Sequence, residues 1–354
     1  MGQATLDDPE AVRAGDPGGM LALVAALGTQ LGEGFDVGRR ASGLPAAEGL
    51  RSIAVCGMGG SGIVGDVVRA AWAARLPVPV VSVKGYQLPA FCGPDTLVLT
   101  VSYSGETEET LAAYAQSVEA GCRVVAICSG GQLADLARTD GVPHVVVPGQ
   151  VPAPRAALGH LMGACGGVLD ATGLIPDVGA ELNGASGVLE QLSAELGPVR
   201  STEGNRAKSL AAWLEGRTPV VWGSEGLAEA AALRWKTQLN ENAKRPAFHA
   251  VLPELDHNEI EGWTEGAGDR FALVILRHSL EHPRIAKRVD ATREAIAGSG
   301  LESREVSVAG ESPMEILLSL VMLGDFVSTY LAILQGVDPM PVQVLSRLKQ
   351  RLRA

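Results

Sequence analysis

Two short segments of the chain carry glycines and hydroxyls where an expected strand gives way to an expected helix. In the first, Cys56–Gly62, glycines fall in the spacing GxGxxG. In the second, Ser102–Thr107, three hydroxyl side chains stand within six residues. Backbone N–H groups at a helix start, together with hydroxyls, can hold a phosphate without a basic side chain. Because both segments would end parallel strands, they predict an anion site at one edge of a sheet.

The glycine spacing allows other interpretations, and two of them fit poorly. A nicotinamide or flavin dinucleotide site requires an acidic residue about 20 residues further on, but the next expected strand ends in Val83 and Lys84. A Walker loop requires a Gly-Lys pair followed by Ser or Thr, which this segment lacks. Two structural interpretations remain. The glycines could simply form a tight strand-to-helix turn, and Ser104 and Thr107 could be ordinary helix-capping residues.

A carboxylate and a histidine in the second half of the chain could move protons. Glu241 falls near the end of an expected helix, where a carboxylate meets the unfavourable end of the helix dipole. That placement suits a general base that works near neutral pH. His257 lies in an expected loop beside Asn258 and Glu259. A solvated surface glutamate and a structural histidine are the alternatives. No second histidine stands at a metal-ligand spacing from His257, so the sequence predicts no metal site.

Two basic residues could complete such a site. Arg155 follows the proline-rich linker Pro148–Pro154, and Lys349 lies in an expected amphipathic helix near the end of the chain. Each, taken alone, is more typical of a solvated surface charge. Whether Arg155 and Lys349 belong to a site therefore depends on which residues the fold places beside them.

Short β-branched runs alternate with Ala- and Leu-rich stretches in both halves of the chain, which predicts parallel sheets with helices on both faces. In the first half we expect strands at 52–56, 78–83, 96–101, 123–128 and 144–147, and helices at 61–74, 106–120, 132–138 and 156–171. In the second half we expect strands at 219–222, 247–251, 271–276 and 305–308, and helices at 227–239, 284–297, 314–334 and 342–353. The helix at 156–171 is rich in small residues and could pack closely on a neighbour.

These elements predict an α/β protein of doubly wound type, divided into an N-terminal domain 1–150, a connecting helical segment 151–200 and a C-terminal domain 201–354. The 354 residues are 46% hydrophobic, which is enough for a sizeable core. The formal net charge of −11 and the 4% of aromatic residues argue against nucleic acid or an anionic membrane as a partner.

Two further features bear on the compartment of the protein. The longest apolar stretch, Ile316–Leu334, contains Asp325 and several Ser, Thr and Gly residues, which favours a buried or subunit-facing helix over a membrane span. The five cysteines form no CxxC pair, and the acidic N-terminus lacks the pattern of a signal peptide. Scattered thiols fit a reducing environment, so we expect a cytoplasmic protein.

Five motifs in this order give the chain a family resemblance. They are GMGGSGIVGD at 57–66, SYSGETEET at 102–110, QLNENAK at 238–244, ELDHNEIEGW at 254–263 and GVDPMPVQVLSRLK at 336–349. The set resembles the sugar isomerase (SIS) fold. More closely, it is similar to the bifunctional phosphoglucose/phosphomannose isomerases of bacteria and archaea, over nearly the whole chain.

The resemblance implies two SIS-type subdomains, each a flavodoxin-like parallel sheet flanked by helices. It implies an isomerase that interconverts fructose 6-phosphate with glucose 6-phosphate, and with mannose 6-phosphate, through a cis-enediol intermediate. It also implies a phosphate pocket formed by Gly59, Gly60, Ser61, Ser102, Ser104 and Thr107.

The same resemblance implies roles for the remaining candidates. Glu241 would be the base that transfers the proton, Arg155 would lie beside the enediolate, and His257 would act with Lys349 in ring opening. Such chemistry needs a base, a charge stabiliser and an acid, and no redox cofactor or metal. In these enzymes the histidine comes from the other subunit, so the resemblance implies a homodimer with His257 donated across the interface.

One departure and three alternatives accompany this expectation. The family often places a threonine shortly before the C-terminal lysine, and here that stretch reads Met340-Pro341-Val342, which weakens the expectation of mannose 6-phosphate turnover. A non-catalytic sugar-phosphate sensor is one alternative, although it would not need to keep Glu241, His257, Arg155 and Lys349 together. A SIS isomerase of a pentose or heptulose phosphate is another, although such enzymes usually have one SIS unit. A nicotinamide dehydrogenase is the weakest.

Overall fold

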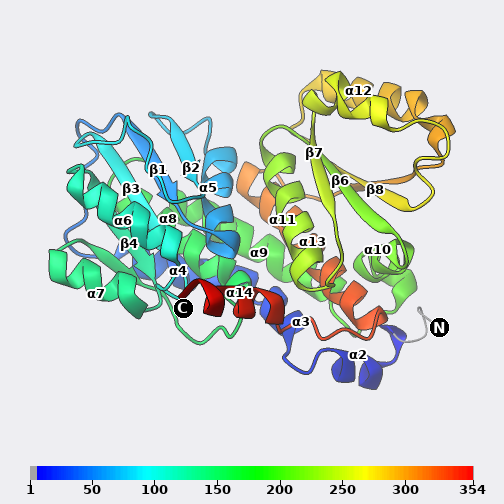
Figure 1. Cartoon of the computed structure of the whole chain (residues 1–354), viewed down its shortest axis with the longest axis horizontal. Coiled ribbons are helices and arrows are strands. Elements are labelled where there is room, and N and C mark those ends of the chain that lie inside the picture. Colours follow the sequence, from blue (N-terminus) through cyan, green and yellow to red (C-terminus); the bar gives the residue numbers. More distant parts are fainter. Residues whose placement is uncertain (1–5, 354) are drawn as a thin grey trace. The chain divides into compact units, whose positions relative to one another are not determined.

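The computed structural model describes residues 6–353, and the chain divides into two compact units. The N-sheet unit consists of Ala25–Gln191 and Val308–Ser319. The C-sheet unit consists of the chain up to Val24, Leu192–Ser307 and the chain from Leu320 onward. Each unit contains one parallel sheet with helices on both faces (Figure 1). The predicted α/β class with two such sheets is therefore confirmed.

The sheet of the N-sheet unit has five parallel strands in the order β2-β1-β3-β4-β5. Their bounds are β1 (Ser52–Cys56), β2 (Val80–Val83), β3 (Thr96–Ser102), β4 (Arg123–Cys128) and β5 (His144–Val146). The central strands β1 and β3 are buried along their whole length. Strands that are covered on both faces are continuous apolar runs, and that pattern made them predictable.

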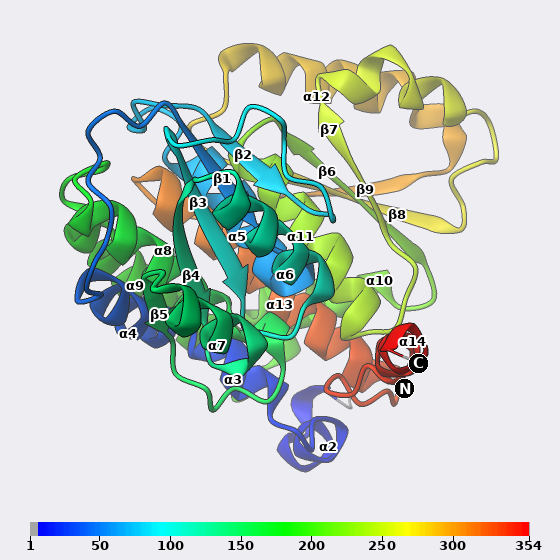
Figure 2. The same ribbon diagram turned by 60° about the vertical axis from the view of Figure 1, so that its left-hand side comes forward.

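Helices cover both faces of this sheet. They are α4 (Leu27–Arg39), α5 (Gly59–Ala71), α6 (Glu108–Glu119), α7 (Gly131–Asp140), α8 (Leu158–Ala171) and most of α9 (Val178–Leu196). Side chains of α6 and α7 share one core with Ala54, Cys56 and Ala126. On the opposite face, α5 approaches the sheet so closely that a Cβ on Gly65 would lie 3.1 Å from Cβ of Val55. Figures 1 and 2 show α6 and α7 on one face and α4 and α8 on the other.

The sheet of the C-sheet unit has four parallel strands in the order β7-β6-β8-β9. They are β6 (Thr218–Ser224), β7 (Phe248–Leu252), β8 (Phe271–Arg277) and β9 (Glu302–Ser307). The α-helices of this unit are α2 (Pro9–Gly15), α3 (Met20–Ala25), α10 (Arg206–Leu214), α11 (Leu227–Glu241), α12 (Pro283–Ala295), most of α13 (Pro313–Leu334) and α14 (Gln343–Arg353). One core packs Trp222 and Ile275 of the sheet against Ile285 and Val289 of α12.

Most expected elements occur within a few residues of the predicted bounds, with two kinds of difference. Strand β9 begins at Glu302, three residues before the expected start at 305. The prediction missed these residues because β9 is an edge strand whose first residues are charged or polar. Helices α2, α3, α4 and α10 were not predicted, and α9 lies in the segment 151–200 that was expected to be helical. The division into domains 1–150, 151–200 and 201–354 stays a prediction.

Helix α13 is the apolar stretch around Asp325. It is long and apolar enough to cross a membrane, and its most apolar window is completely buried in the structure. Asp325 is buried with Arg234 of α11, whose Nε and Nη2 donate to the two carboxylate oxygens at 3.1 and 2.8 Å. A two-pronged pair of this kind satisfies both buried charges. The expectation of a buried helix is confirmed.

Helices α4 and α8 make an unusually close backbone contact. Glycines on both helices face the partner: a Cβ on Gly163 would lie 2.1 Å from the carbonyl oxygen of Leu31, and one on Gly34 would lie 2.2 Å from that of His160. Four glycines in α4 lower its intrinsic helix stability by about 1 kcal/mol each relative to alanine. The close packing that they permit compensates for that loss. The predicted close packing of 156–171 on a neighbour is confirmed.

We expect Gly163→Ala to destabilise the N-sheet unit by about 1–3 kcal/mol, because the added methyl group must push α8 away from the α4 backbone. Urea unfolding followed by far-UV circular dichroism would measure this as a lower midpoint. Gly187→Ala in α9 is the matched control, since a Cβ there meets nothing within 4 Å. The control should leave stability equal or slightly higher, by up to about 1 kcal/mol. Equal midpoints for the two variants would contradict the packing argument.

Candidate active site

The glycine-rich and hydroxyl-rich segments lie at the same edge of the first sheet. The first leads from β1 into α5 and the second leads from β3 into α6, and β1 and β3 are neighbours. The chain turns from β1 toward β2 on one side and reaches β3 on the other, so the space between β1 and β3 is the switch point of the sheet. Ligands of doubly wound sheets bind at this position.

Both helix starts leave backbone donors for a ligand. The residues that precede α5 and α6 are Met58 and Thr107, and among the described residues neither helix start receives a side-chain capping hydrogen bond. The N–H groups of a helix's first turn have no partner inside the helix, and the helix dipole adds partial positive charge there. Two such starts at adjacent strand ends present donors that suit an anion and need no lysine. We call this arrangement the phosphate cradle; its residues are Gly59, Gly60, Ser61, Ser102, Ser104 and Thr107.

The hydroxyls of the cradle are held by local hydrogen bonds. The hydroxyl of Ser102 donates to Oγ1 of Thr107 at 3.0 Å, which ties the strand end to the helix start. Thr107 occupies the N-cap position of α6, but its side chain makes no capping hydrogen bond there. Ser104 accepts from the N–H of Glu106 at 3.2 Å, so its local turn role is real.

Tyr103, which sequence reasoning missed, connects three parts of the site. Its N–H donates to Oγ of Ser61 at 3.1 Å and so joins the two cradle loops. Its phenol donates to the carbonyl of Pro148 and accepts from the N–H of Val151, both at 2.9 Å. Burial raises the pKa of Tyr103, and the bond from Val151 opposes this. The linker that leads to Arg155 is thereby fixed to the cradle.

The structure places Arg155 directly beside the cradle. Arg155 is buried in the short 3-10 helix η1 (Pro154–Ala157). A Cβ on Gly60 would lie 2.6 Å from Cα of Arg155, so only glycine allows η1 to approach the first turn of α5. Gly59 adopts a φ of +53°, which a side chain would disfavour. Two glycines of the motif therefore serve the turn and the approach of Arg155, in addition to any ligand.

A second cationic side chain, that of Lys84, lies at the carboxyl end of β2, on the same edge of the sheet as the cradle. Lys84 follows β2 and forms a close ion pair with Asp66 of α5, whose side chain is largely buried. A Cβ on Gly62 would lie 3.6 Å from Cε of Lys84. The pair fixes α5 against the end of β2 and so supports the first cradle loop.

In the C-sheet unit, Glu241 is the last residue of α11. Lys244 turns the chain with a φ of +54° and donates from Nζ to the carbonyl of Glu241 at 2.6 Å and to that of Pro339 at 3.2 Å. A cation at the end of a helix balances its exposed carbonyls. The lysine therefore fixes the residue that precedes the turn and ties it to the segment before α14.

Glu241 lines a cavity of about 710 Å³. The wall is formed by the end of α11 and by the start of α14, and its residues are Asn240, Glu241, Lys244, Arg245, Pro246, Val337, Asp338, Pro341, Val342, Gln343, Val344 and Leu345. The segment in which the sequence departs from the family pattern thus borders the carboxylate. A cavity of this size suits a small metabolite.

The other two candidates lie elsewhere in the C-sheet unit. His257 is exposed and closes the 3-10 helix η3 (Glu254–His257), and Lys349 is exposed in α14. The described residues that line the Glu241 cavity include neither of them. The cradle and Arg155 belong to one compact unit and Glu241, His257 and Lys349 to the other, so their convergence in one site stays a prediction. Within residues 6–353, no group of three or more His, Cys, Asp or Glu side chains is arranged to hold a metal ion.

Comparison with family models assigns both sheets. Residues 49–150 match the SIS domain, and residues 203–352 match the family described as bacterial phospho-glucose isomerase C-terminal SIS domain. The first range contains the phosphate cradle and the second contains Glu241, His257 and Lys349.

Relatives match the chain from end to end. It is 36% identical over 336 residues to a bifunctional phosphoglucose/phosphomannose isomerase of Caldicellulosiruptor bescii, which covers 94% of this chain and 98% of the relative. It is 35% identical over 306 residues to the protein of the same name from Aquifex aeolicus, covering 86% and 91%. The chain belongs to the bifunctional phosphoglucose/phosphomannose isomerase family. It is an isomerase, as the resemblance predicted.

Solved structures agree with the fold of this isomerase family. A glucose-6-phosphate isomerase like protein from Thermus thermophilus superimposes with a TM-score of 0.65 at 20% identity, covering 98% of this chain and 99% of that one. The C-terminal domain of glucosamine-fructose-6-phosphate aminotransferase from Francisella tularensis gives a TM-score of 0.69 at 14% identity, covering 90% and 97%. At these identities the likeness shows the fold alone.

We expect Gly60→Ala to lower the kcat/KM of isomerisation by about 10²-fold, because the methyl group forces η1 and Arg155 away from the cradle and a displacement near 1 Å has that effect on rate. A steady-state isomerase assay would measure it. Gly85→Ala, in the loop after β2, is the matched control because a Cβ there meets nothing within 4 Å. Wild-type kcat/KM for Gly60→Ala would show that Arg155 need not lie where the structure has it.

Proposed function

We propose that the protein interconverts fructose 6-phosphate with glucose 6-phosphate, and more slowly with mannose 6-phosphate, through a cis-enediol intermediate. The observation that carries this proposal is the end-to-end match to relatives with that pair of activities in their name, at 36% identity over 94% of the chain. The cradle supports it, because its donors suit a phosphate dianion. The carboxylate of Glu241 beside a cavity of metabolite size supports it further.

In the proposed reaction the cradle holds the phosphate group and fixes the sugar. His257 and Lys349 open the ring by proton transfer to and from the ring oxygen and the anomeric hydroxyl. Glu241 then removes the proton from the carbon next to the carbonyl, and the electron pair moves to give the enediolate. Arg155 stabilises the negative oxygen. A proton moves from the hydroxyl oxygen on the neighbouring carbon to the former carbonyl oxygen, and Glu241 returns its proton to the carbon that carried the carbonyl, so that the carbonyl moves by one position. A positioned base contributes about 10²–10⁴-fold in rate.

The preference for glucose over mannose 6-phosphate rests on the wall of the Glu241 cavity. Val342 lines that wall where the family often has a threonine nearby, and valine cannot donate a hydrogen bond to a sugar hydroxyl. The two sugars differ only in the configuration of one hydroxyl, at the carbon that receives the proton when they form from fructose 6-phosphate. Loss of one hydroxyl partner near that carbon therefore disfavours one epimer.

A second candidate activity comes from one relative. A D-glucosamine-6-phosphate 4-epimerase of Sulfolobus acidocaldarius is 32% identical over 235 residues, covering 66% of this chain and 71% of the relative. Its shorter match ranks it below the isomerase. The cradle would serve both substrates equally, so only turnover of each compound separates the two.

We also propose that the active form is a homodimer in the cytoplasm, with His257 supplied by the second subunit. His257 is exposed on η3, and the described residues around Glu241 do not include it. A second copy is the source of histidine that the family resemblance implies. Free cysteines, four of them buried, fit a reducing compartment.

We expect Glu241→Gln to lower the kcat for fructose 6-phosphate by about 10²–10⁴-fold, because an amide cannot accept the proton. A coupled assay that detects glucose 6-phosphate and mannose 6-phosphate separately would measure both products. Binding of fructose 6-phosphate, measured by calorimetry, should stay within a few-fold of wild type because the cradle is untouched.

Glu265→Gln, in an exposed loop, is the matched control and should keep wild-type kcat. A Glu241→Gln protein with unchanged kcat would exclude Glu241 as the base. If the wild-type protein turns over neither sugar but epimerises glucosamine 6-phosphate, the second candidate takes its place.

The dimer proposal predicts complementation between two inactive variants. Heterodimers of Glu241→Gln and His257→Ala subunits, purified through two different tags, should regain about half of the wild-type activity, because one of the two sites then holds both intact residues. The homodimer of each variant, prepared in the same way, is the control. Heterodimers as inactive as both controls would place His257 and Glu241 in the same subunit.

A further inference from the structure

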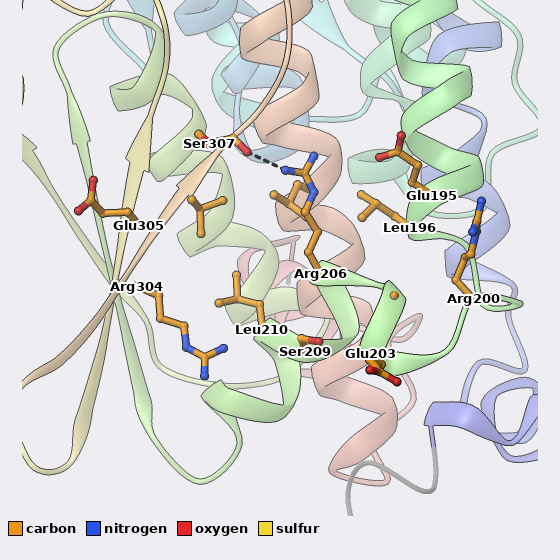
Figure 3. A pocket seen from close by; sticks show the side chains of 13 residues that line it. Glu195, Leu196, Arg200, Glu203, Arg206, Ser209, Leu210, Arg304, Glu305 and Ser307 are labelled. Carbon is orange, nitrogen blue, oxygen red and sulfur yellow. Dashed lines mark hydrogen bonds between the residues drawn. The ribbon is translucent and has the colours of Figure 1, made fainter.

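The C-sheet unit contains a second cavity, of about 740 Å³, that the proposed reaction does not use. It lies between the segment that joins α9 to α10 and the end of β9, with Leu323 of α13 in its wall. Figure 3 shows the guanidinium of Arg206 pointing toward Ser307 and that of Arg304 pointing away from it, with Glu195 and Arg200 on the other side of Arg206. None of the residues implied in isomerisation lines it.

Three guanidinium groups and three carboxylates line this cavity. They belong to Arg200, Arg206 and Arg304 and to Glu195, Glu203 and Glu305. The carboxylate of Glu305 is already shared by Arg277 and Arg293, which lie outside the wall. Arg304 in turn acts electrostatically on Glu302, which also lies outside the wall. The remaining guanidinium groups of the wall are those of Arg200 and Arg206.

Arg206 lies in the middle of the cavity (Figure 3). Its Nη1 donates to the carbonyl of Ser307 at 2.7 Å. Loss of water around its guanidinium lowers the pKa of Arg206, and Glu195 opposes this. Within the described part of the chain, no carboxylate lies within ion-pair distance of Arg206. A guanidinium that has lost part of its water and lacks a close carboxylate is a ready partner for an anion.

Arg304 lines the same cavity from β9. Its guanidinium lies over the ring of Trp213, 4.7 Å from the centroid, and this contact leaves the charge in place. Planar guanidinium groups bind phosphate through two parallel hydrogen bonds. The cavity volume falls within the range of small-molecule sites and leaves room for more than a bare phosphate ion.

The cavity also adjoins three of the places where the chain passes between its compact units. Ser307 is the last residue before the passage at 307/308, Glu195 follows the passage at 191/192 by four residues, and Leu323 follows that at 319/320 by four residues. A ligand bound to the guanidinium of Arg206 would therefore contact the same group that donates to the carbonyl of Ser307. Binding would thus affect a segment that connects the two units, without contact to the cradle.

We propose that this cavity binds a phosphate dianion, as free inorganic phosphate or as part of a small phosphorylated metabolite, through Arg206 and Arg304, and that its occupation lowers isomerase turnover. The binding half of this inference stands on the cavity alone. The turnover half rests on the proposed function, because the residues of the reaction are divided between the two units.

Calorimetry in a background that weakens the cradle by removing two of its hydroxyls tests the binding half, and the variants of Arg206 and Arg304 identify the binding signal that belongs to the second cavity. In the Ser102→Ala/Thr107→Val protein, inorganic phosphate and glycerol 3-phosphate are titrated separately. We expect one of them to bind, with affinity at least tenfold weaker after Arg206→Gln or after Arg304→Gln, since each removes a charged donor. Arg217→Gln is the matched control: it lies on the same Trp213 ring, pairs with Glu302 and does not line the cavity.

Each result of this titration decides the matter. Tighter binding of glycerol 3-phosphate identifies a phosphorylated metabolite as the ligand class, and binding of inorganic phosphate alone identifies the free ion. Absence of binding for both probes, or equal affinities in the two cavity variants and the control, would overturn the proposal. Arg304→Gln on the exposed edge strand keeps the test valid should Arg206→Gln fail to fold.

Kinetics at saturating fructose 6-phosphate test the turnover half. Saturation removes competition at the cradle, so a fall in kcat of twofold or more on addition of the bound probe reports the second cavity. The same addition should leave the kcat of Arg206→Gln unchanged. An unchanged kcat in the wild-type protein, with binding intact, would refute this half. A protein without isomerase activity would refute the proposed function and leave the calorimetric result standing.

Discussion

The site depends on backbone N–H groups that two helices leave unsatisfied. Helices α5 and α6 both begin at the switch point of the first sheet, and among the described residues no side chain caps either start. A phosphate bound there would satisfy donors that otherwise face only water. The surrounding elements serve this arrangement: glycines let η1 approach, Tyr103 joins the loops, and the Lys84–Asp66 pair fixes α5. Short-range dipoles suit a protein whose net charge of −11 repels anions at longer distance.

Those parts of the fold that follow from local sequence could be predicted. Buried parallel strands are apolar runs, so β1 and β3 were expected within one residue of their observed ends. The loops that follow them were recognisable because glycines and hydroxyls are unusual at such density. Their meeting at one edge followed from the parallel order alone, since the carboxyl ends of neighbouring strands lie together.

Features that depend on distant partners could not be predicted. Helix α4 contains four glycines, which is more typical of a loop. It is helical because its backbone packs against α8 at a distance that only glycine allows at the contact positions. Nothing in the local sequence distinguishes Tyr103, which stands between two serines, yet its hydrogen bonds connect segments as far as 48 residues apart. From the sequence, Ser104 and Thr107 were equally good candidates for helix capping, and only the observed hydrogen bonds distinguish them.

The position of Glu241 shows the same division between local and distant causes. The local sequence predicts that it lies near the end of α11, where residues of high helix propensity end. Its surroundings come from a segment almost a hundred residues later, which Lys244 holds through the carbonyl of Pro339. Because that lysine has a left-handed backbone that normally favours glycine, the turn is maintained against its own conformational preference. A side chain with three donors, bonded to carbonyls on both sides of the cavity, supplies the compensation. The backbone of Glu241 and the segment that forms the facing wall of the cavity are thus tied together by one residue.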